Sequence, residues 1–267
     1  MAQQPVLSAT FTLLLAFAST PDPARIIRQA YAAWERDTAR LTGYIYLDRT
    51  ETRNLDNAGK PKSVTSKTHE MRMIEGSPYR RLLEQDGKPV SPEEQRLQEA
   101  YLKDNIERRK NESPAERRRR IAEYEKKRDR FKPASREIPD AFTFKLAGEE
   151  TIQGRKYWLI DAAPRPGYEP KDRYSRLFPH VTARLWIDQQ EHNWMKCKAQ
   201  LNDVVAFGWI LVRLGKGAQV EMEQSRLPEG LWVPSRLWYR VSARIGLVKN
   251  YHIEEETVYS GYRRNAR

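Results

Sequence analysis

The sequence predicts a mainly β protein with some helix, in which one broad antiparallel sheet follows a first helix and contains a charged helical insertion. About ten segments rich in aromatic and β-branched residues are each bounded by Gly, Pro, Asn or Asp, as strands joined by short turns are. The segment before them has the periodicity of an amphipathic helix, and one segment among them is polar nearly all round. A sheet of this width must curl or cover its concave face.

The composition limits the class of protein. Of the 267 residues, 39% are hydrophobic and 31% are charged, which excludes a membrane channel or transporter and fits one large domain with a long solvated segment. Lys and Arg together exceed Asp and Glu by 12. That excess permits binding to nucleic acid, anionic lipid or a polyanionic envelope polymer, but it selects none of them.

The N-terminus has features of a secretory signal peptide over residues 1–18. This stretch carries no charged side chain, and its apolar run at residues 6–18 is too short to span a bilayer and ends in Ala16-Phe17-Ala18, a small-residue cleavage pattern. No Lys or Arg precedes the run, so a buried N-terminal helix or strand is the alternative. No Cys follows it to carry a lipoprotein anchor. We therefore expect a periplasmic or secreted bacterial protein, soluble after cleavage, with residues 19–267 as a single domain.

Residues 24–41 are predicted to form the first helix, with an apolar stripe of Ile27, Ala30, Tyr31, Trp34 and Leu41. The period then changes, and strands are expected at residues 43–52, 63–74, 79–85, 142–150, 156–163, 183–188, 194–201, 219–226, 232–245 and 249–259. A short helix is expected at residues 172–178. Residues 204–214 favour a strand over a short helix, because Gly208 weakens a helix. The first helix is the natural cover for the concave face.

A charged helical insertion is predicted at about residues 91–137. Ser91-Pro92-Glu93-Glu94 and Ser113-Pro114-Ala115-Glu116 both place a capping serine before a proline and acidic residues, which is typical of helix N-termini. Two helices are therefore expected, at residues 92–110 and 114–131. We expect them to lie on a surface or project from it, because their apolar stripe is thin and consists of Leu97, Tyr101, Ile106, Ile121, Tyr124 and Phe131.

Four parts of the sequence carry a resemblance to a known family. They are the exported start and helix before Gly43-Tyr44-Ile45-Tyr46, the strand-turn-strand Gly148-Glu149-Glu150-Thr151-Ile152-Gln153-Gly154-Arg155-Lys156-Tyr157-Trp158, the segment Arg184-Leu185-Trp186-Ile187-Asp188 with Trp194-Met195-Lys196, and Leu231-Trp232-Val233-Pro234-Ser235-Arg236 with Val258-Tyr259-Ser260-Gly261-Tyr262. On these segments the chain resembles the outer-membrane lipoprotein-sorting family, the periplasmic lipoprotein carriers with the LolA/LolB-like fold, over about residues 24–53 and 142–262. The resemblance implies an open antiparallel half-barrel sheet, with the N-terminal helix as a lid over an apolar concave cavity that holds acyl chains.

Two features depart from that family. The charged helical segment at residues 92–131 is foreign to the simple carriers, and the basic balance is strong. The carriers also need an arginine that tethers the lid, and the sequence does not identify one here. The fold carries over better than the lipoprotein cargo, because a fold does not determine a function.

No catalytic or metal-binding motif is found in the sequence. It has no HExxH, HxH, GxSxG, Walker A or GxGxxG run, and its four histidines form no recognisable signature with Cys197, the single cysteine. Neighbouring carboxylates such as Glu149 and Glu150 are expected on opposite faces of a strand, so they rarely share a site. We therefore expect a protein that is not an enzyme and has no cofactor or metal, in which Cys197 is a small packed side chain. An active site assembled from distant positions is the alternative.

Aromatic residues of the expected sheet are the candidate ligand-binding residues, as the wall of an apolar cavity. They are Tyr44, Tyr46, Trp158, Trp186, Trp194, Phe207, Trp209 and Trp238. Core packing is the simpler interpretation for any one tryptophan, but a single curved sheet has one concave face on which to bury all of them. The candidate partner-binding residues are Arg117, Arg118, Arg119 and Arg120, where interspersed acids favour an exposed, salt-bridged helix over a phosphate-binding arm.

These observations predict a non-enzymatic cell-envelope protein that binds a lipid-like or lipoprotein ligand in the concave face of a curved sheet. Lipid or lipoprotein acyl chains are the expected partners, an envelope protein or anionic headgroups are further ones, and nucleic acid is a poor partner for an exported protein. The alternative is a protein-interaction or envelope-sensor module that docks a partner through the charged helices at residues 92–131. A monomer is expected.

Overall fold

A computed structural model describes residues 21–207, 212–245 and 249–265 of the protein. The signal peptide expected at residues 1–18 and the candidate ligand residue Trp209 lie outside the described residues. Within the described residues the helices are α1 (Pro23–Leu41), α2 (Pro92–Lys110), α3 (Pro114–Arg128), the 3-10 helix η1 (Asp129–Phe131), α4 (Lys132–Ala141) and the 3-10 helix η2 (Ser175–His180).

Thirteen described strands form one antiparallel sheet in the order β4-β3-β2-β1-β13-β12-β11-β8-β7-β6-β5, with β9 and β10 paired to each other and β10 also to β12. Because β4 and β5 are separate edges, the sheet is open, and the predicted fold class is confirmed. The strands are β1 (Tyr44–Leu55), β2 (Pro61–Ile74), β3 (Ser77–Gln85), β4 (Lys88–Pro89), β5 (Phe142–Ile152), β6 (Arg155–Pro164), β7 (Val181–Asp188), β8 (Trp194–Leu201), β9 (Val205–Phe207), β10 (Val212–Leu214), β11 (Gln219–Arg226), β12 (Trp232–Ile245) and β13 (Lys249–Arg264).

The helices begin where the sequence chemistry places them. Asp22 caps α1, and Ser91 and Ser113 cap α2 and α3, each immediately before a proline in the first turn. Helix α4 was not predicted. The second helix of the insertion was expected to end at residue 131, but in the structure η1 leads directly into α4. Ala134, Ile138 and Ala141 recur at helical spacing there, and Ile138 and Ala141 pack with Phe142 at the start of β5.

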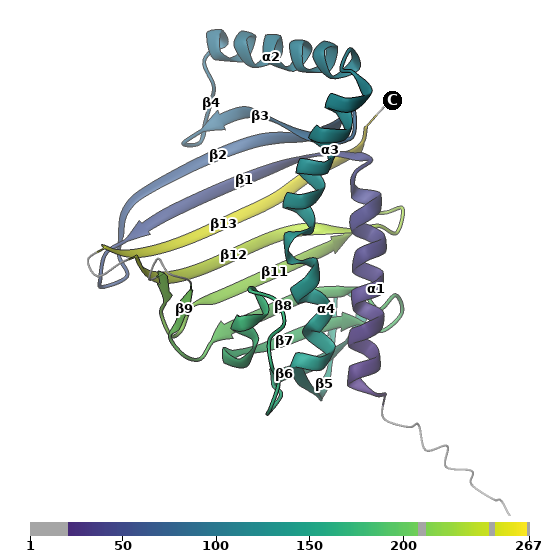
Figure 1. Cartoon of the computed structure of the whole chain (residues 1–267), viewed down its shortest axis with the longest axis vertical. Coiled ribbons are helices and arrows are strands. Elements are labelled where there is room, and N and C mark those ends of the chain that lie inside the picture. The colour runs from purple at the N-terminus through teal and green to yellow at the C-terminus, as the bar shows by residue number, and fades with distance from the viewer. Residues whose placement is uncertain (1–20, 208–211, 246–248, 266–267) are drawn as a thin grey trace, which may run out of the picture.

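Helices α1, α3 and α4 lie across one face of the sheet, and α3 with α4 forms a column beside α1 (Figure 1). We call this face the helix-side face and the opposite one the outer face. Helix α2 lies apart from them, near strands β3 and β4 at one end of the sheet (Figure 1). The charged insertion therefore has two parts. Helix α2 lies at one end of the sheet, and the column of α3 and α4 covers one face of the sheet.

The main core lies between α1 and the strands at the β5 end of the sheet. Ile26, Ile27 and Ala30 of α1 pack on Ile160 of β6 and Ile187 of β7, and both strand residues are fully buried. Alternation along β6 and β7 directs these two side chains toward the helix. The burial of such aliphatic side chains contributes about 1.5–3 kcal/mol each relative to exposure, so α1 is an integral part of the core.

A buried carboxylate fixes the C-terminal half of α1. Asp37, 4% exposed, accepts hydrogen bonds at Oδ2 from Asn193 Nδ2 at 2.8 Å and from the Trp232 amide at 3.3 Å. These donors come from the β7–β8 turn and from β12, which are distant in sequence from α1. Helix α1 is thus bonded to two separate parts of the sheet.

Candidate functional site

A cavity of about 510 Å³ opens between the helix-side face of β1–β3 and the helices α1 and α3. Such a volume falls within the range of small-molecule binding sites. Most of its wall is apolar, and the apolar and aromatic lining residues are Trp34, Ala39 and Leu41 of α1, Tyr44, Tyr46, Met71, Met73 and Pro78 of the sheet, and Tyr124 and Phe131 of the insertion. The cavity is bounded by the sheet on one side and by a helix on each of two others.

The floor of the cavity is a cluster of tyrosines. The ring of Tyr46 stacks on Tyr262 with 5.2 Å between centroids, and the centroid of the Tyr259 ring is 6.2 Å from that of Tyr46. Burial raises the pKa of Tyr46 to about 12, so its hydroxyl stays neutral. Tyr44 donates from its hydroxyl to Glu229 Oε1 at 2.6 Å, and Tyr262 donates to the carbonyl of Pro234. Tyr44 and Tyr46 thus offer their rings to a ligand, while the hydroxyl groups of Tyr44 and Tyr262 bond within the protein.

A bulge in β13 makes this cluster possible. Residues three apart on a regular strand lie on opposite faces, yet Tyr259 and Tyr262 both contact Tyr46. The register between β1 and β13 shifts by one residue in this interval, and Gly261 has a φ of +62° there. The extra residue turns both rings to the helix-side face.

The rim of the cavity at η1 is charged. Arg128 donates to Asp129 Oδ1 at 2.6 Å and lies 5.3 Å above the Tyr124 ring, and Lys132 Nζ is 3.1 Å from the same Asp129 oxygen. The hydrogen bond from Arg128 lowers the pKa of Asp129 to about 2. An apolar interior with a charged rim suits a ligand whose hydrocarbon part enters the cavity.

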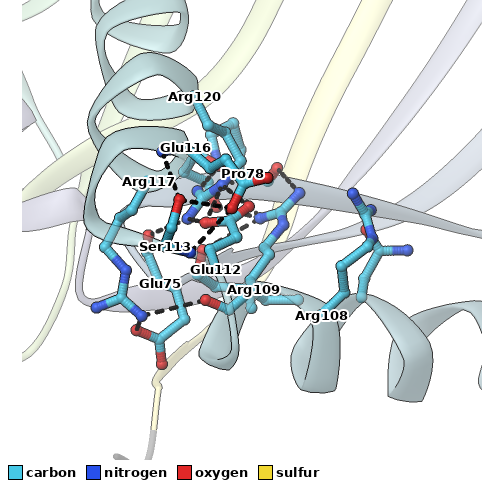
Figure 2. Close-up of polar contacts among 12 residues, drawn as sticks. Glu75, Pro78, Arg108, Arg109, Glu112, Ser113, Glu116, Arg117 and Arg120 are labelled. Carbon is cyan, nitrogen blue, oxygen red and sulfur yellow. Dashed lines mark hydrogen bonds and ion pairs between the residues drawn. The ribbon is translucent and has the colours of Figure 1, made fainter.

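Arginines fix the insertion to the turn between β2 and β3 (Figure 2). Arg109, 8% exposed, donates to the carbonyls of Ile74, Ser77 and Pro78 at 3.0–3.3 Å. Arg120 of α3 donates to Ser77 Oγ, to the Glu75 carbonyl and to Glu112. These charge-assisted hydrogen bonds to carbonyl groups around the turn attach both helices to the sheet.

The predicted ligand residues occupy four different surroundings. Tyr44 and Tyr46 line the cavity. Trp158 and Trp194 also lie on the helix-side face, but they pack on the core under α1 rather than in the cavity. Trp186 donates to Glu150 on the outer face, and Trp238 shares that face because it alternates with Leu237. Phe207 pairs through its backbone with Val212 of β10.

The predicted partner residues divide into two pairs. Arg120 bonds the β2–β3 turn, and Arg117 bonds the Arg109 carbonyl and Glu75, so both contribute to internal contacts (Figure 2). Arg118 and Arg119 are exposed, and Arg119 pairs with Glu123 at 3.4 Å. An arginine run on one helix reaches both a packed and a solvated side, because successive residues are about 100° apart around the axis, which places Arg117 near Arg120 and turns the two residues between them away.

Several cavity residues were not among the predicted site residues. Met71 and Met73 alternate with charged residues on β2, which is the signal of a strand with one apolar face. Trp34 and Leu41 were on the predicted stripe of α1, and Tyr124 and Phe131 on the thin stripe of the insertion. Nothing local in the sequence indicates that these three stripes meet at one cavity.

The described residues offer no sign of metal chemistry or of a membrane span. No three His, Cys, Asp or Glu side chains among them come together as a metal ion requires, and none of the described helices is both long and apolar enough to cross a bilayer. Cys197 faces Leu185 and Met222 across neighbouring strands, and burial raises the pKa of its thiol to about 12. A thiol that stays protonated at neutral pH is a poor nucleophile.

No protein-family model and no curated protein matches the sequence. Solved structures do. The chain is similar to LolA-type proteins. An outer-membrane lipoprotein-sorting protein domain from Vibrio parahaemolyticus is 9% identical with a TM-score of 0.34, over 90% of this chain and 94% of that one. A LolA superfamily protein from Nitrosomonas europaea is 9% identical with a TM-score of 0.32, over 93% and 96%.

The complex of MucA and MucB from Pseudomonas aeruginosa also matches, at 10% identity and a TM-score of 0.23, over 89% of this chain and 100% of that one. The resemblance predicted from the sequence is thus confirmed as a similarity of fold. At such low identity the similarity does not extend to the ligand or the partner.

Proposed function

We propose that the protein is a non-enzymatic binding or carrier protein of the cell envelope, which holds the hydrocarbon part of a lipid or lipoprotein in the cavity between the sheet and helices α1 and α3. The apolar run at residues 6–18 supports export. The ligand-binding residues in this proposal are Tyr44 and Tyr46, which line the cavity, together with Met71 and Met73.

The apolar cavity is the observation that carries the proposal. It runs along α1 from Trp34 to Thr42, which at 1.5 Å per residue is about 12 Å. One leaflet of a bilayer core is about 15 Å thick, half of the roughly 30 Å core, so a cavity of this length suits most of an acyl chain. Transfer of hydrocarbon out of water gains about 25 cal/mol per Å² of buried apolar surface, and no catalytic group is needed for it.

Filling the cavity tests this function. Ala39 of α1 lines the cavity and is exposed, so Ala39→Trp is expected to fill the space while leaving the core intact, and to weaken binding of a fluorescent fatty acid about tenfold or more. Ala32 is also exposed on α1 but does not line the cavity, so Ala32→Trp is the matched control and should bind as the unchanged protein does.

Two measurements check the result. Fluorescence titration gives the affinity of each variant, and native mass spectrometry of protein purified from the periplasm shows whether lipid is carried with it. Equal binding by the two tryptophan variants, or no binding of the fatty acid by the unchanged protein, would contradict a hydrocarbon site in this cavity.

A second candidate function is docking of an envelope protein through α2. Leu97 and Tyr101 are four residues apart on this helix and are 45% and 56% exposed, so they form an apolar pair on one helical face. Helix α2 lies apart from the column that covers the sheet (Figure 1). An exposed aromatic and aliphatic pair on a helix is a common anchor for a partner.

Removal of that pair tests docking. The double variant Leu97→Ser and Tyr101→Ser should lose any protein that co-purifies from the periplasm, while it keeps the fatty-acid affinity of the unchanged protein because neither residue lines the cavity. Quantitative mass spectrometry of the purified material provides the measurement. A co-purifying protein that is retained at the same level by the double variant would rule out this surface.

A further inference from the structure

A second, polar compartment continues the apolar cavity along the same face of the same three strands. Asp48 on β1 and His69 on β2 are the next helix-side residues after Tyr46 and Met71, and on β3 Arg80 follows Pro78. Successive residues on one face of a strand are about 6.6 Å apart. The compartment has a volume of about 530 Å³, and Tyr259, which contacts Tyr46 of the apolar cavity, is part of its wall.

Hydroxyl groups and charged side chains make up most of the lining of this compartment, with Leu237 beside them. Its hydroxyl groups come from Thr50, Thr52, Thr65, Thr257 and Tyr259. Thr50 Oγ1 and Thr257 Oγ1 are 2.9 Å apart, so they bond to each other and retain capacity for a further partner. Five hydroxyl groups on three neighbouring strands form a surface that suits a polar head group rather than a chain.

One pair of charges in the compartment is neutralised within the protein. Arg80 donates to Oδ1 of Asp48 at 2.7 Å, and Asp48 is 5% exposed. His69 Nδ1 lies 3.4 Å from the same oxygen. Burial lowers the pKa of His69, and the positive charge of Arg80 lowers it further, so the imidazole is neutral at pH 7. These three groups together contribute no net charge.

One positive and one negative side chain remain. Lys67 of β2 is exposed and Glu255 of β13 is half-buried, and neither has an ion-pair partner among the described residues. Glu255 accepts a hydrogen bond from Thr52 Oγ1 at 2.9 Å, which orients its carboxylate. The register places Lys67 opposite Thr50 and Glu255 opposite Thr52, on the two sides of β1, so their Cα atoms are roughly 12 Å apart across the compartment.

We infer that this compartment binds the head group of the amphiphile, and that the head group is zwitterionic, with a phosphate held by Lys67 and an ammonium held by Glu255. The inference rests on the proposed hydrocarbon site and adds the head-group class to it. An anionic head group places a second negative charge beside Glu255, and an uncharged one brings no counter-charge to either side chain. A phosphate–ammonium head group satisfies both.

Three soluble short-chain probes with identical acyl chains distinguish the head groups. They are a diacyl phosphoethanolamine, a diacyl phosphoglycerol and a diacylglycerol, each titrated by calorimetry below the concentration at which it aggregates. The phosphoethanolamine is expected to bind about tenfold or more tightly than either of the others, as charge-assisted hydrogen bonds allow.

Variants of the two charged side chains assign the contacts. Glu255→Gln keeps the acceptor for Thr52 and should reduce the preference for phosphoethanolamine over phosphoglycerol to about onefold. Lys67→Gln should weaken both phospholipids about tenfold and leave diacylglycerol unchanged. Lys62→Gln is the matched control, because Lys62 is exposed on the same strand and does not line the compartment.

The outcomes separate this inference from the proposed function. Equal affinity of the unchanged protein for all three probes overturns the head-group site and leaves the hydrocarbon site standing. A preference for phosphoglycerol likewise overturns the zwitterionic assignment. Failure of all three probes to bind, together with failure of the fatty acid, overturns both. Loss of all three probes in Ala39→Trp supports a continuous site.

Discussion

A β-carbon added to Gly76 would lie 2.8 Å from Ile121 Cδ1 of α3, closer than such atoms approach without a shift. Gly76 has a φ of +85° and follows Glu75 at +46°, so the two residues form the tight turn between β2 and β3. We expect Gly76→Ala to lower the free energy of unfolding by about 2 kcal/mol, because it adds backbone strain to a contact with α3. Urea denaturation measures this loss.

Gly154→Ala is the matched control that isolates the cost of backbone strain from the cost of the contact with α3. Gly154 has a φ of +79° after Gln153 at +49°, in the turn between β5 and β6, and a β-carbon there would meet nothing within 4 Å. Gly154→Ala therefore has the strain without the contact, and we expect it to cost about 1 kcal/mol less than Gly76→Ala. If the two variants lose the same stability, α3 is not seated on the β2–β3 turn.

Single residues show where sequence reasoning ends. Tyr44 and Tyr46 could be placed on one face of the sheet, because alternation is a local rule and no neighbour alters it. Arg109 and Arg120 could not be assigned to the β2–β3 turn, since they bond residues more than 30 positions away. Their local sequence pattern is the same as that of arginines on a fully solvated helix. Pairing across a fold leaves no mark on the local pattern.

The helices illustrate the same limit at the scale of elements. The starts of α2 and α3 were predicted from Ser91 and Ser113, because a capping serine acts on amides two or three residues away. Helix α4 was not predicted, since Pro139 lies inside it and it has only ten residues. Its stability comes from packing on β5, which follows it directly, and on η2, from which β5 and β6 separate it in the sequence.

Helix α1 and the α3–α4 column differ in how they are held to the sheet. Helix α1 has buried aliphatic residues and the buried Asp37, which bonds the backbone of Trp232. No residue of α3 is buried, and arginine hydrogen bonds at its N-terminal end hold it. Tertiary packing supplies most of the stability of a helix in a protein. The α3 wall of the cavity is therefore the one that a bulky ligand can displace at least cost, with α1 as the fixed wall.

Across the whole molecule the two faces of the sheet have opposite characters. On the outer face, Arg53 bonds Glu254, which also pairs with Arg240, and Arg236 bonds Glu256. The helix-side residues of the same strands line the two compartments. The sequence predicted the strands and their alternation, but not which face the helices cover. That choice depends on the combined burial of α1 and the insertion. The tryptophans of the described strands do not reveal it, because Trp158 and Trp194 lie on one face and Trp186 on the other.

The protein as a whole is expected to lose stability in acid. Burial alone would raise the pKa of Glu70 and of Asp188, but hydrogen bonds from arginines outweigh it and lower both, from Arg263 and Arg72 to Glu70 and from Arg155 to Asp188. A carboxyl group whose pKa is lower in the folded than in the unfolded chain adds stability above its unfolded pKa, near 4, and loses it as the pH falls through the folded value.

The free energy of unfolding should therefore fall slightly from pH 7 to pH 5, where the lowered pKa of His69 lets the unfolded chain bind more protons, and fall by about 2 kcal/mol more by pH 3, because Glu70 and Asp188 are 4% and 0% exposed and little screened by solvent. Denaturant titrations at each pH measure it. Asp188→Asn should be less stable at pH 7 and lose less on acidification, since one of the two buried carboxylates no longer titrates. Asp161→Asn is the control, because its pair with Arg184 is exposed and contributes little. A stability that stays level down to pH 3 would mean that these arginine–carboxylate pairs are not formed in the folded protein.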